Sequence, residues 1–451
     1  MKKKISVSLA IAIAIIAMTV TFSVTMILAM QMFDKTVSDV NEKQVMYNKL
    51  AELDKTTRDN YYGTINDQTL YDMLSTGYIA GLGDKFSKYY TAKQVNEIND
   101  TASGKLMGIG ADMVKDASGY FRVVKIYTGS PAESVGLTKD TIVTKLDDTD
   151  LKGLTLDAVK SMLKGESGTV LHITYLVNNE EQTVDLQRSV YETPSVEFEL
   201  NNAVGYIKIT TFTTDTAAKL DYAINSLKSQ GAVALVFDVR NNTGGTLSAA
   251  AECIDLLCPA GTIVSGVYKN NETKVLYTSD ESEVDLPMVV LTNGNTAFGA
   301  ELFATSIRDF GKGKIVGTKT AGRGTVQKMY TMSDGSAVDL TVAVMVPGKS
   351  ESFDGVGITP DYEKALTAEE EQAFYDFTVT SDPQIMRASE VAESLAKGNS
   401  GNGPVQPAAT ESPAPEASSS SQPAGESTSP AADSSSAPAS SAPQNSSAAQ
   451  D

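Results

Sequence analysis

The residues best suited to chemistry follow an apolar run at residues 233–238 that has the composition of a buried strand. The next segment ends in the glycine pair Gly244-Gly245 and opens a predicted helix. Paired glycines at such a turn let backbone N–H groups approach a ligand closely, and a helix N-terminus favours developing negative charge. The turn is therefore a candidate for half of an oxyanion hole, the element that stabilises the intermediate of acyl transfer. By itself, Gly-Gly before a helix is more often only a tight turn.

The composition restricts which base such a site can use. The chain has one histidine, His172, in an alternating stretch at residues 170–176 that predicts a strand. Catalysis by serine and histidine and the histidine-rich zinc sites all need imidazole, so any hydrolytic base is predicted not to be histidine. The two cysteines, Cys253 and Cys258, lie on an apolar, predicted helical stretch and are interpreted as small buried hydrophobic residues. No metal or other cofactor is implied.

Four segments together carry a family resemblance, which covers about residue 40 to residue 365. Residues 238–245, 293–301, 317–327 and 355–361 resemble the motifs of the carboxyl-terminal processing peptidases, also called tail-specific serine peptidases. The resemblance implies an α/β (α+β) peptidase core with an inserted PDZ-like, β-rich domain.

The resemblance also assigns the catalytic positions. In this family a serine is activated by a lysine 25 residues later, and a glutamine four residues beyond the lysine supports it. Thr296 matches the first hydroxyl position of the family's serine-rich run, which puts Phe298 at the nucleophile position, Arg323 at the base position and Gln327 at its family place. Phenylalanine has no heteroatom, and arginine keeps its proton at physiological pH. The predicted site is therefore catalytically dead, with Gly244 and Gly299 as the remaining oxyanion-hole residues.

Two rival interpretations remain open at this point. A shifted pair of Thr296 and Lys319 would restore a serine/threonine-type endopeptidase, although a residue two places along a turn usually points elsewhere. A misaligned segment is the other rival, and the 25-residue spacing argues against it. For an inactive site we expect Phe298 to fill the former cleft, with Arg323 holding a carboxylate or paired with a neighbour such as Asp238 or Glu301.

A second binding function is implied by the PDZ-like segment. Met107, Gly108, Ile109 and Gly110 resemble the loop whose N–H groups hold the terminal carboxylate of a peptide added as a strand to the sheet edge. The turn at residues 138–141 departs from the usual Pro-Gly-Asp of the family. We therefore predict peptide or protein C-termini as ligands, and the family resemblance implies a homodimer or pairing with an active homologue as a further partner.

The N-terminus predicts a membrane anchor. Lys2, Lys3 and Lys4 precede an uncharged run of 29 residues from Ile5 to Phe33, and about 20 apolar helical residues cross a bilayer. A cleaved signal peptide normally has a shorter apolar region, so we expect an uncleaved single-pass anchor in the cell membrane. The lysines before the span place the N-terminus in the cytoplasm and the bulk of the chain outside.

Composition shifts divide the remaining chain. The net charge of −19 gives no electrostatic footprint for nucleic acid. The final segment is rich in Ser, Ala and Pro and cannot bury enough apolar surface to fold. The predicted organisation is a transmembrane signal-anchor at 1–33, a helical region at 34–97, a PDZ-like domain at 98–180, an α/β core at 190–365, a C-terminal helical segment at 366–396 and a disordered tail at 397–451.

Overall fold

The computed structural model of the 451-residue chain describes residues 7–398, so the predicted tail lies almost wholly outside the described residues. The predicted anchor begins outside them as well, at residues 1–6. The first described element is helix α1 (Val7–Asn60). A search of the described chain finds no helix that is both long and apolar enough to cross a membrane.

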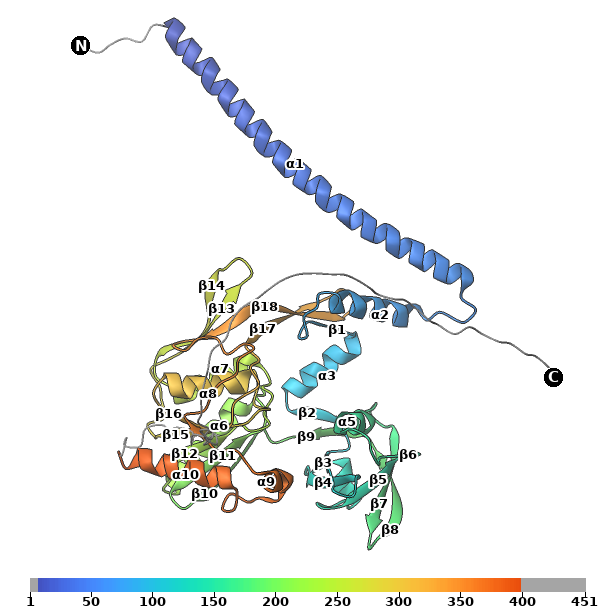
Figure 1. The fold of residues 1–451 in the computed structure, drawn as a ribbon, viewed down its shortest axis with the longest axis vertical. Coiled ribbons are helices and arrows are strands. Elements are labelled where there is room, and N and C mark those ends of the chain that lie inside the picture. The colour runs from blue at the N-terminus through green and yellow to red at the C-terminus, as the bar shows by residue number, and fades with distance from the viewer. Residues whose placement is uncertain (1–6, 399–451) are drawn as a thin grey trace, which may run out of the picture. The chain divides into compact units, whose positions relative to one another are not determined.

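A mixed sheet forms the centre of the α/β core (Figure 1). Strand β10 pairs antiparallel with β11, and the other neighbouring pairs in the sheet are parallel. The predicted strands at 204–209, 233–238 and 288–291 are confirmed. In spatial order the strands are β10 (Val196–Asn201), β11 (Val204–Ile209), β12 (Ala234–Asp238), β15 (Met288–Thr292), β16 (Gly313–Gly317) and β19 (Tyr362–Glu363).

Helices cover both faces of this sheet, which explains why every residue of β12 is buried. On one face Leu235 and Phe237 share a hydrophobic cluster with the helices α6 (Thr216–Ser229), α7 (Leu247–Leu257) and α8 (Gly299–Asp309). On the other face Val236 packs in a cluster with α10 (Pro383–Ala396), which lies opposite α6–α8 in Figure 1. Successive strand residues point to opposite faces, so a strand covered on both sides is apolar throughout.

A second sheet connects the core to the N-terminal region. It contains β1, whose residues pair antiparallel with β18, so the region predicted as helical at 34–97 also supplies a strand. Both cysteines are buried and form no disulfide, as predicted. The elements added here are α2 (Asp67–Ala80), β1 (Lys88–Tyr90), α3 (Ala92–Ala102), β13 (Gly261–Tyr268), β14 (Thr273–Ser279), β17 (Thr325–Thr331) and β18 (Ala337–Pro347).

The inserted β-rich module has its own hydrophobic core, which runs from Ile109 to Leu186. Its main sheet has the order β3-β4-β5-β7-β8, with β3 at an edge, and it ends beyond the predicted limit of residue 180. The predicted helix near residues 155–163 is confirmed as α5. The module consists of β2 (Lys105–Gly108), β3 (Ala111–Lys115), β4 (Phe121–Ile126), α4 (Pro131–Ser134), β5 (Ile142–Leu146), β6 (Thr149–Asp150), α5 (Leu156–Leu163), β7 (Val170–Val177), β8 (Glu180–Gln187) and β9 (Ser189–Glu192).

The chain after the core forms α9 (Ala368–Gln372), a 3₁₀ turn η1 (Phe374–Asp376) and α10. Helix α10 begins at Pro383, and the Asp382 carboxylate accepts hydrogen bonds from the first backbone N–H groups of the helix. Proline at the first helical position and an acidic N-cap both favour this start.

Candidate active site

The predicted catalytic positions meet at the carboxyl end of the central sheet. Residues after β12 lead into α7 and residues after β15 lead into α8, and the loop after β16 bonds to Glu301 in the first turn of α8. Neighbouring parallel strands end at the same edge, which is where α/β folds place their sites. The segments 238–245, 293–301 and 317–327, which carry the family resemblance, thus begin at or follow the carboxyl ends of three neighbouring strands.

Phe298 stands on a strained turn immediately before α8. Its backbone has φ 55° and ψ −116°, and the other non-glycine residues with positive φ among the described residues are all Asn or Asp. A bulky residue in this region is a backbone outlier, and such strain is typical of functional sites. The side chain is 7% exposed and packs against Gly244, where an added Cβ would lie 2.9 Å from the Cβ of Phe298. The phenylalanine therefore fills the position that the family resemblance gives to the nucleophile.

Arg323 is held by aromatic rings. Its guanidinium carbon lies 5.0 Å from the ring centroid of Phe298 and 4.9 Å from that of Phe86, within the range of cation–π contacts. Its Nε is buried with no hydrogen-bond partner. The expectation of an ion pair with Asp238 or Glu301 is wrong, because Asp238 pairs with Arg240, and Glu301 contacts Arg323 through its backbone N–H rather than its guanidinium.

Glu301 is the fully buried carboxylate that organises this turn. Its Oε1 accepts from the Thr320 hydroxyl and from the Gly322 N–H at 2.7 Å. Its Oε2 accepts from the N–H of Arg323 at 2.8 Å and from that of Phe298 at 3.0 Å. These four hydrogen bonds, at the positive end of the α8 dipole, satisfy the buried carboxylate of Glu301. Glu301 thereby holds the backbone of residue 298 close to that of residue 323.

The proposed substitute pair is not assembled. The Thr296 hydroxyl is buried, donates to the Val239 carbonyl at 2.8 Å and accepts from the Asn293 N–H at 3.0 Å, as a turn-capping hydroxyl does. Lys319 is exposed and makes no hydrogen bond to Thr296. The structure therefore does not bring Thr296 and Lys319 together as a nucleophile and base.

Gln327, Gly244 and Gly299 take part in different interactions. The amide nitrogen of Gln327 donates to the hydroxyls of Thr325 and Thr341, both at 2.9 Å, so it supports the β17–β18 pair. The N–H of Gly244 donates to Asn242 Oδ1 at 2.8 Å and is occupied. For the N–H of Gly299, at the start of α8, the described chain offers no acceptor. Of the two predicted oxyanion-hole groups, the N–H of Gly299 therefore has no acceptor among the described residues, whereas the N–H of Gly244 is already engaged.

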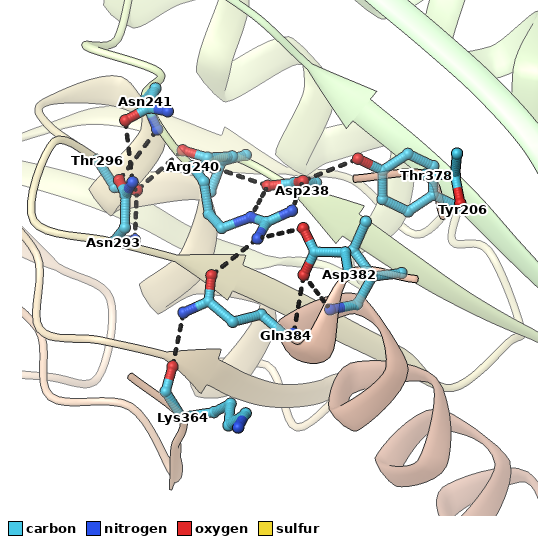
Figure 2. A network of polar contacts seen from close by, with 12 residues as sticks. Tyr206, Asp238, Arg240, Asn241, Asn293, Thr296, Lys364, Thr378, Asp382 and Gln384 are labelled. Atoms are coloured by element: carbon cyan, nitrogen blue, oxygen red, sulfur yellow. Dashed lines mark hydrogen bonds and ion pairs between the residues drawn. The ribbon is translucent and has the colours of Figure 1, made fainter. Parts of the chain in front are cut away.

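Sequence reasoning missed a buried ion network behind this site (Figure 2). Arg240 donates to both oxygens of Asp238, at 2.9 and 2.6 Å, and to Asp382 Oδ2 at 2.9 Å. The Tyr206 hydroxyl donates to Asp238, and Gln384 accepts from Arg240 at 2.7 Å. Burial raises the pKa of Asp238, but the adjacent guanidinium outweighs it, so the net pKa is lowered. The close spacing of Asp238 and Arg240 in the sequence is a signal for an ion pair between them. Nothing in the neighbouring sequence indicates that Arg240 also binds Asp382, the N-cap of α10.

The predicted peptide-binding loop lies between β2 and β3 in the inserted module. The carbonyl of Ile109 accepts from the N–H of Ala132 at 2.8 Å, and the carbonyl of Gly110 accepts from that of Tyr127 at 3.0 Å. Gly110 has φ 72°, and a Cβ there would lie 2.2 Å from the Cβ of Ser130, so the turn requires glycine. Ile109 and Gly110 are buried, and their N–H groups find no acceptor within the described residues. Unpaired N–H groups at a buried turn are suited to a carboxylate.

The remaining titratable candidates do not form a centre. His172 is exposed on β7, where its Nδ1 lies 2.6 Å from Asp185 Oδ1; this bond raises the pKa of the imidazole. Within residues 7–398, no group of three or more His, Cys, Asp or Glu side chains is placed to hold a metal ion.

Comparison with known proteins gives concordant matches. The family model described as peptidase family S41 matches residues 203–364. A protein of Staphylococcus aureus (strain MRSA252) named "Probable CtpA-like serine protease" is 30% identical over 343 residues, which span 75% of this chain and 69% of that protein. A protein of the same name from Staphylococcus epidermidis is 29% identical, over 75% of this chain and 70% of that protein. A solved structure named "Putative S41 protease" from Bacteroides fragilis NCTC 9343 matches with TM-score 0.51 and 20% identity, covering 74% of this chain and 92% of that chain, and so shares the fold.

Proposed function

We propose that this chain, which belongs to peptidase family S41, the family of the carboxyl-terminal processing peptidases, is a pseudo-peptidase. It keeps the peptidase fold and binds peptide C-termini or partner proteins without cutting them. The observation that carries the proposal is Phe298, an apolar ring on a strained turn where the family resemblance puts the nucleophile.

The chemistry of the site supports inactivity. A serine-type peptidase needs an attacking oxygen and a group that removes its proton. Phe298 has no such oxygen, and Arg323, stacked between Phe298 and Phe86, keeps its proton. Losing either member of a catalytic pair removes most of the rate, and losing the second changes little more. Relocation to Thr296 is disfavoured because its hydroxyl already donates to the Val239 carbonyl.

Binding is supported by the inserted module. The N–H groups of Ile109 and Gly110 lack partners in the described chain, and β3 next to them is an edge strand. An extended chain end added to β3 would pair its backbone with that edge and bring its terminal carboxylate to the two N–H groups. This arrangement is PDZ-like, and it does not depend on positions 298 and 323.

We also propose that residues 1–33 anchor the protein in the cell membrane, with the folded part extracytoplasmic. The three lysines followed by the 29-residue uncharged run support this topology. The full chain, expressed in a bacterial cell, is expected in the alkali-resistant membrane fraction, whereas a chain that starts at Gln44 is expected in the soluble fraction. Equal partition of the two chains would contradict the anchor.

The decisive test of inactivity compares the natural chain with a double variant, Phe298→Ser and Arg323→Lys. Both are incubated with unstructured proteins and with peptides that have apolar C-termini, and cleavage is measured by mass spectrometry. The natural chain is expected to leave every substrate intact. The double variant restores a hydroxyl on the strained turn beside a base that can lose its proton, so it is expected to cut, with Phe298→Ala as the inert control.

The proposal fails if the natural chain cleaves. In that case Thr296→Ala separates the two explanations, because a relocated nucleophile predicts that this single change stops cleavage. Cleavage that survives Thr296→Ala would place the chemistry at a residue outside the motif.

A further inference from the structure

The segment between β19 and α10 forms a lid, defined here as residues 365–378, which includes α9 and η1. The core holds both of its ends. Before the lid, the N–H of Lys364 donates to the Gly317 carbonyl at 2.8 Å, and the Gln384 amide donates to the Lys364 carbonyl at 2.6 Å. After the lid, Val379 is buried in the cluster that contains α10. None of residues 365–378 is itself buried, so the lid is a loop with fixed ends and little packing of its own.

The middle of the lid is bound to the inserted module. Arg122 of β4 donates to both carboxylate oxygens of Asp376, at 2.8 and 3.1 Å. The Nζ of Lys139 donates to the Tyr375 carbonyl at 3.2 Å and lies 3.7 Å from the Asp376 carboxylate. In Figure 1 the lid, with α9, reaches from the core toward β3 and β4 of the module. The contacts of Arg122 and Lys139 with the lid are here called the latch.

The latch is the weaker of the two attachments of the lid. The side chains of Asp376 and Lys139 are 47% and 48% exposed, and ion pairs open to water contribute little and are readily broken. The attachment to the core includes the buried Val379 and the Phe374 ring, which lies 5.0 Å from the guanidinium carbon of Arg240. The contact with the module is therefore the one that opens first.

The latch also explains a departure from the family pattern. The turn at residues 138–141 replaces the usual Pro-Gly-Asp, and Lys139 stands in the place of the glycine. Glycine has no side chain that reaches the lid. The residue that departs from the peptide-binding module of the family thus supplies one of the two latch contacts.

The lid borders the space into which a peptide would bind. A cavity of about 550 Å³ lies between the module and the core, and its lining includes the edge strand β3. Phe374, Tyr375 and Phe377 of the lid line the same cavity. A chain end that adds to β3 therefore enters beside the lid. The latch side chains of Arg122, Lys139 and Asp376 lie outside the lining, so they can be changed without changing the surface that the peptide meets.

We propose that the lid controls entry to the peptide groove: the latch holds it closed, and it must leave the module before a peptide C-terminus adds to β3. The inference rests on the proposed peptide-binding function and adds its control. The observed association rate is then the rate for the open form multiplied by the fraction of molecules that are open. The strength of the latch sets that fraction.

The test uses the full-length chain and a fluorescein-labelled peptide of eight residues with an apolar last residue, made with a free and with an amidated C-terminus. Association rate constants are measured by stopped-flow fluorescence polarisation. Asp376→Asn removes the charge that binds Arg122 and keeps the shape of the side chain. It is expected to raise the association rate constant of the free peptide about fivefold, the change in open fraction that follows from the loss of one strong surface ion pair.

Asp140→Asn is the matched control. The Asp140 carboxylate binds the same Arg122 at 2.6 Å, but it belongs to the module and does not hold the lid. Both substitutions remove one negative charge beside the same arginine, so the long-range attraction of the peptide changes alike. Asp140→Asn is expected to keep the natural association rate. Arg122→Gln is expected to act as Asp376→Asn does, and the two together to add little to either alone, because both break one ion pair.

The outcomes separate the two proposals. If the free peptide binds neither the natural chain nor Asp376→Asn, or if amidated and free peptides bind alike, the proposed peptide-binding function is overturned and this inference falls with it. If the free peptide binds but Asp376→Asn leaves its association rate unchanged or lowers it, or if Asp140→Asn raises it as much, only the inference is overturned.

Both carboxylates suit these substitutions. Asp376 and Asp140 are exposed, so a change to asparagine is not expected to disturb packing. Asparagine also tolerates the positive φ of 71° at residue 140. Far-ultraviolet circular dichroism verifies that each variant is folded.

Discussion

Replacing Arg240 with methionine is expected to lower the free energy of unfolding by about 3–5 kcal/mol, because it leaves two buried carboxylates without their cation. The side chains of Arg240, Asp238 and Asp382 are 3%, 2% and 3% exposed, so water cannot take the place of the guanidinium. Methionine keeps much of the volume, which isolates the loss of charge from the creation of a cavity. Urea denaturation followed by circular dichroism measures the change.

Arg387→Met is the matched control. Arg387 lies on α10, the helix whose N-cap is Asp382, but its side chain is 36% exposed, pairs with Glu390 at 3.0 Å and lies 5.3 Å from the centroid of the Tyr362 ring. An exposed pair of this kind contributes at most about 1 kcal/mol, so this variant is expected to change stability little. Equal effects of the two substitutions would show that the buried network contributes no more than a surface pair.

The same network predicts a dependence on pH. The folded-state pKa of Asp238 is lowered, so its contribution is fully present above its unfolded pKa of about 3.9 and is lost as the pH falls through the folded value. Arg240→Met removes the guanidinium that lowers this pKa most, so burial would outweigh the remaining influence of Lys208, and the pKa of Asp238 is expected to rise above the ordinary range. The variant should therefore begin to lose stability at a higher pH than the natural chain during acid titration.

Replacing Glu301 with glutamine is expected to cost about 3 kcal/mol or more. Each Glu301 oxygen accepts two hydrogen bonds, and glutamine would set an amide group against two of the four donors. Each buried donor that loses its acceptor costs about 1–3 kcal/mol, and hydrogen bonds to a charged group are stronger than neutral ones. Loss of this carboxylate is also expected to release the turn that holds Phe298, measurable as faster amide hydrogen exchange at the start of α8.

Glu252→Gln on α7 provides the comparison for this change, since Glu252 is exposed and its substitution should fall within about 0.5 kcal/mol of the natural chain. If Glu301→Gln behaves like Glu252→Gln, the strained backbone of Phe298 is held by packing alone. Retention of the natural exchange rate at α8 would point the same way.

The strands of the core were predictable because their signals are local, whereas the site positions were taken from the family resemblance. The apolar runs at 204–209 and 233–238 match β11 and β12 closely, since strands buried on both faces leave little alternative to continuous apolar sequence. Phe298 and Arg323 are separated by 25 residues, as the family pattern requires, and their side chains stack in the structure. Motif spacing constrains geometry here because both positions flank the same pair of strands.

The partners of Arg323 and Arg240 were not predictable, because each comes from a distant part of the chain. Phe86, which stacks on Arg323, belongs to the N-terminal region and carries no motif. Asp382 caps α10 and reaches Arg240 only after that helix has packed on the sheet. The expected ion pair of Arg323 was reasonable for a sheltered arginine, but two aromatic rings lie against its guanidinium, Asp238 pairs with Arg240 instead, and Glu301 binds backbone N–H groups.

The ion pair between Arg122 and Asp376 has a consequence for the order in which the chain folds during synthesis. Arg122 and Asp376 are 254 residues apart, so this link between the module and the segment after the core forms only after the module and the sheet have both left the ribosome. Helix α10 follows Asp376 and covers the face of the sheet that includes Val236. A nascent chain therefore presents a bare apolar sheet face until α10 emerges. Chaperone capture or quality-control proteolysis would act in that interval, which ends when α10 docks.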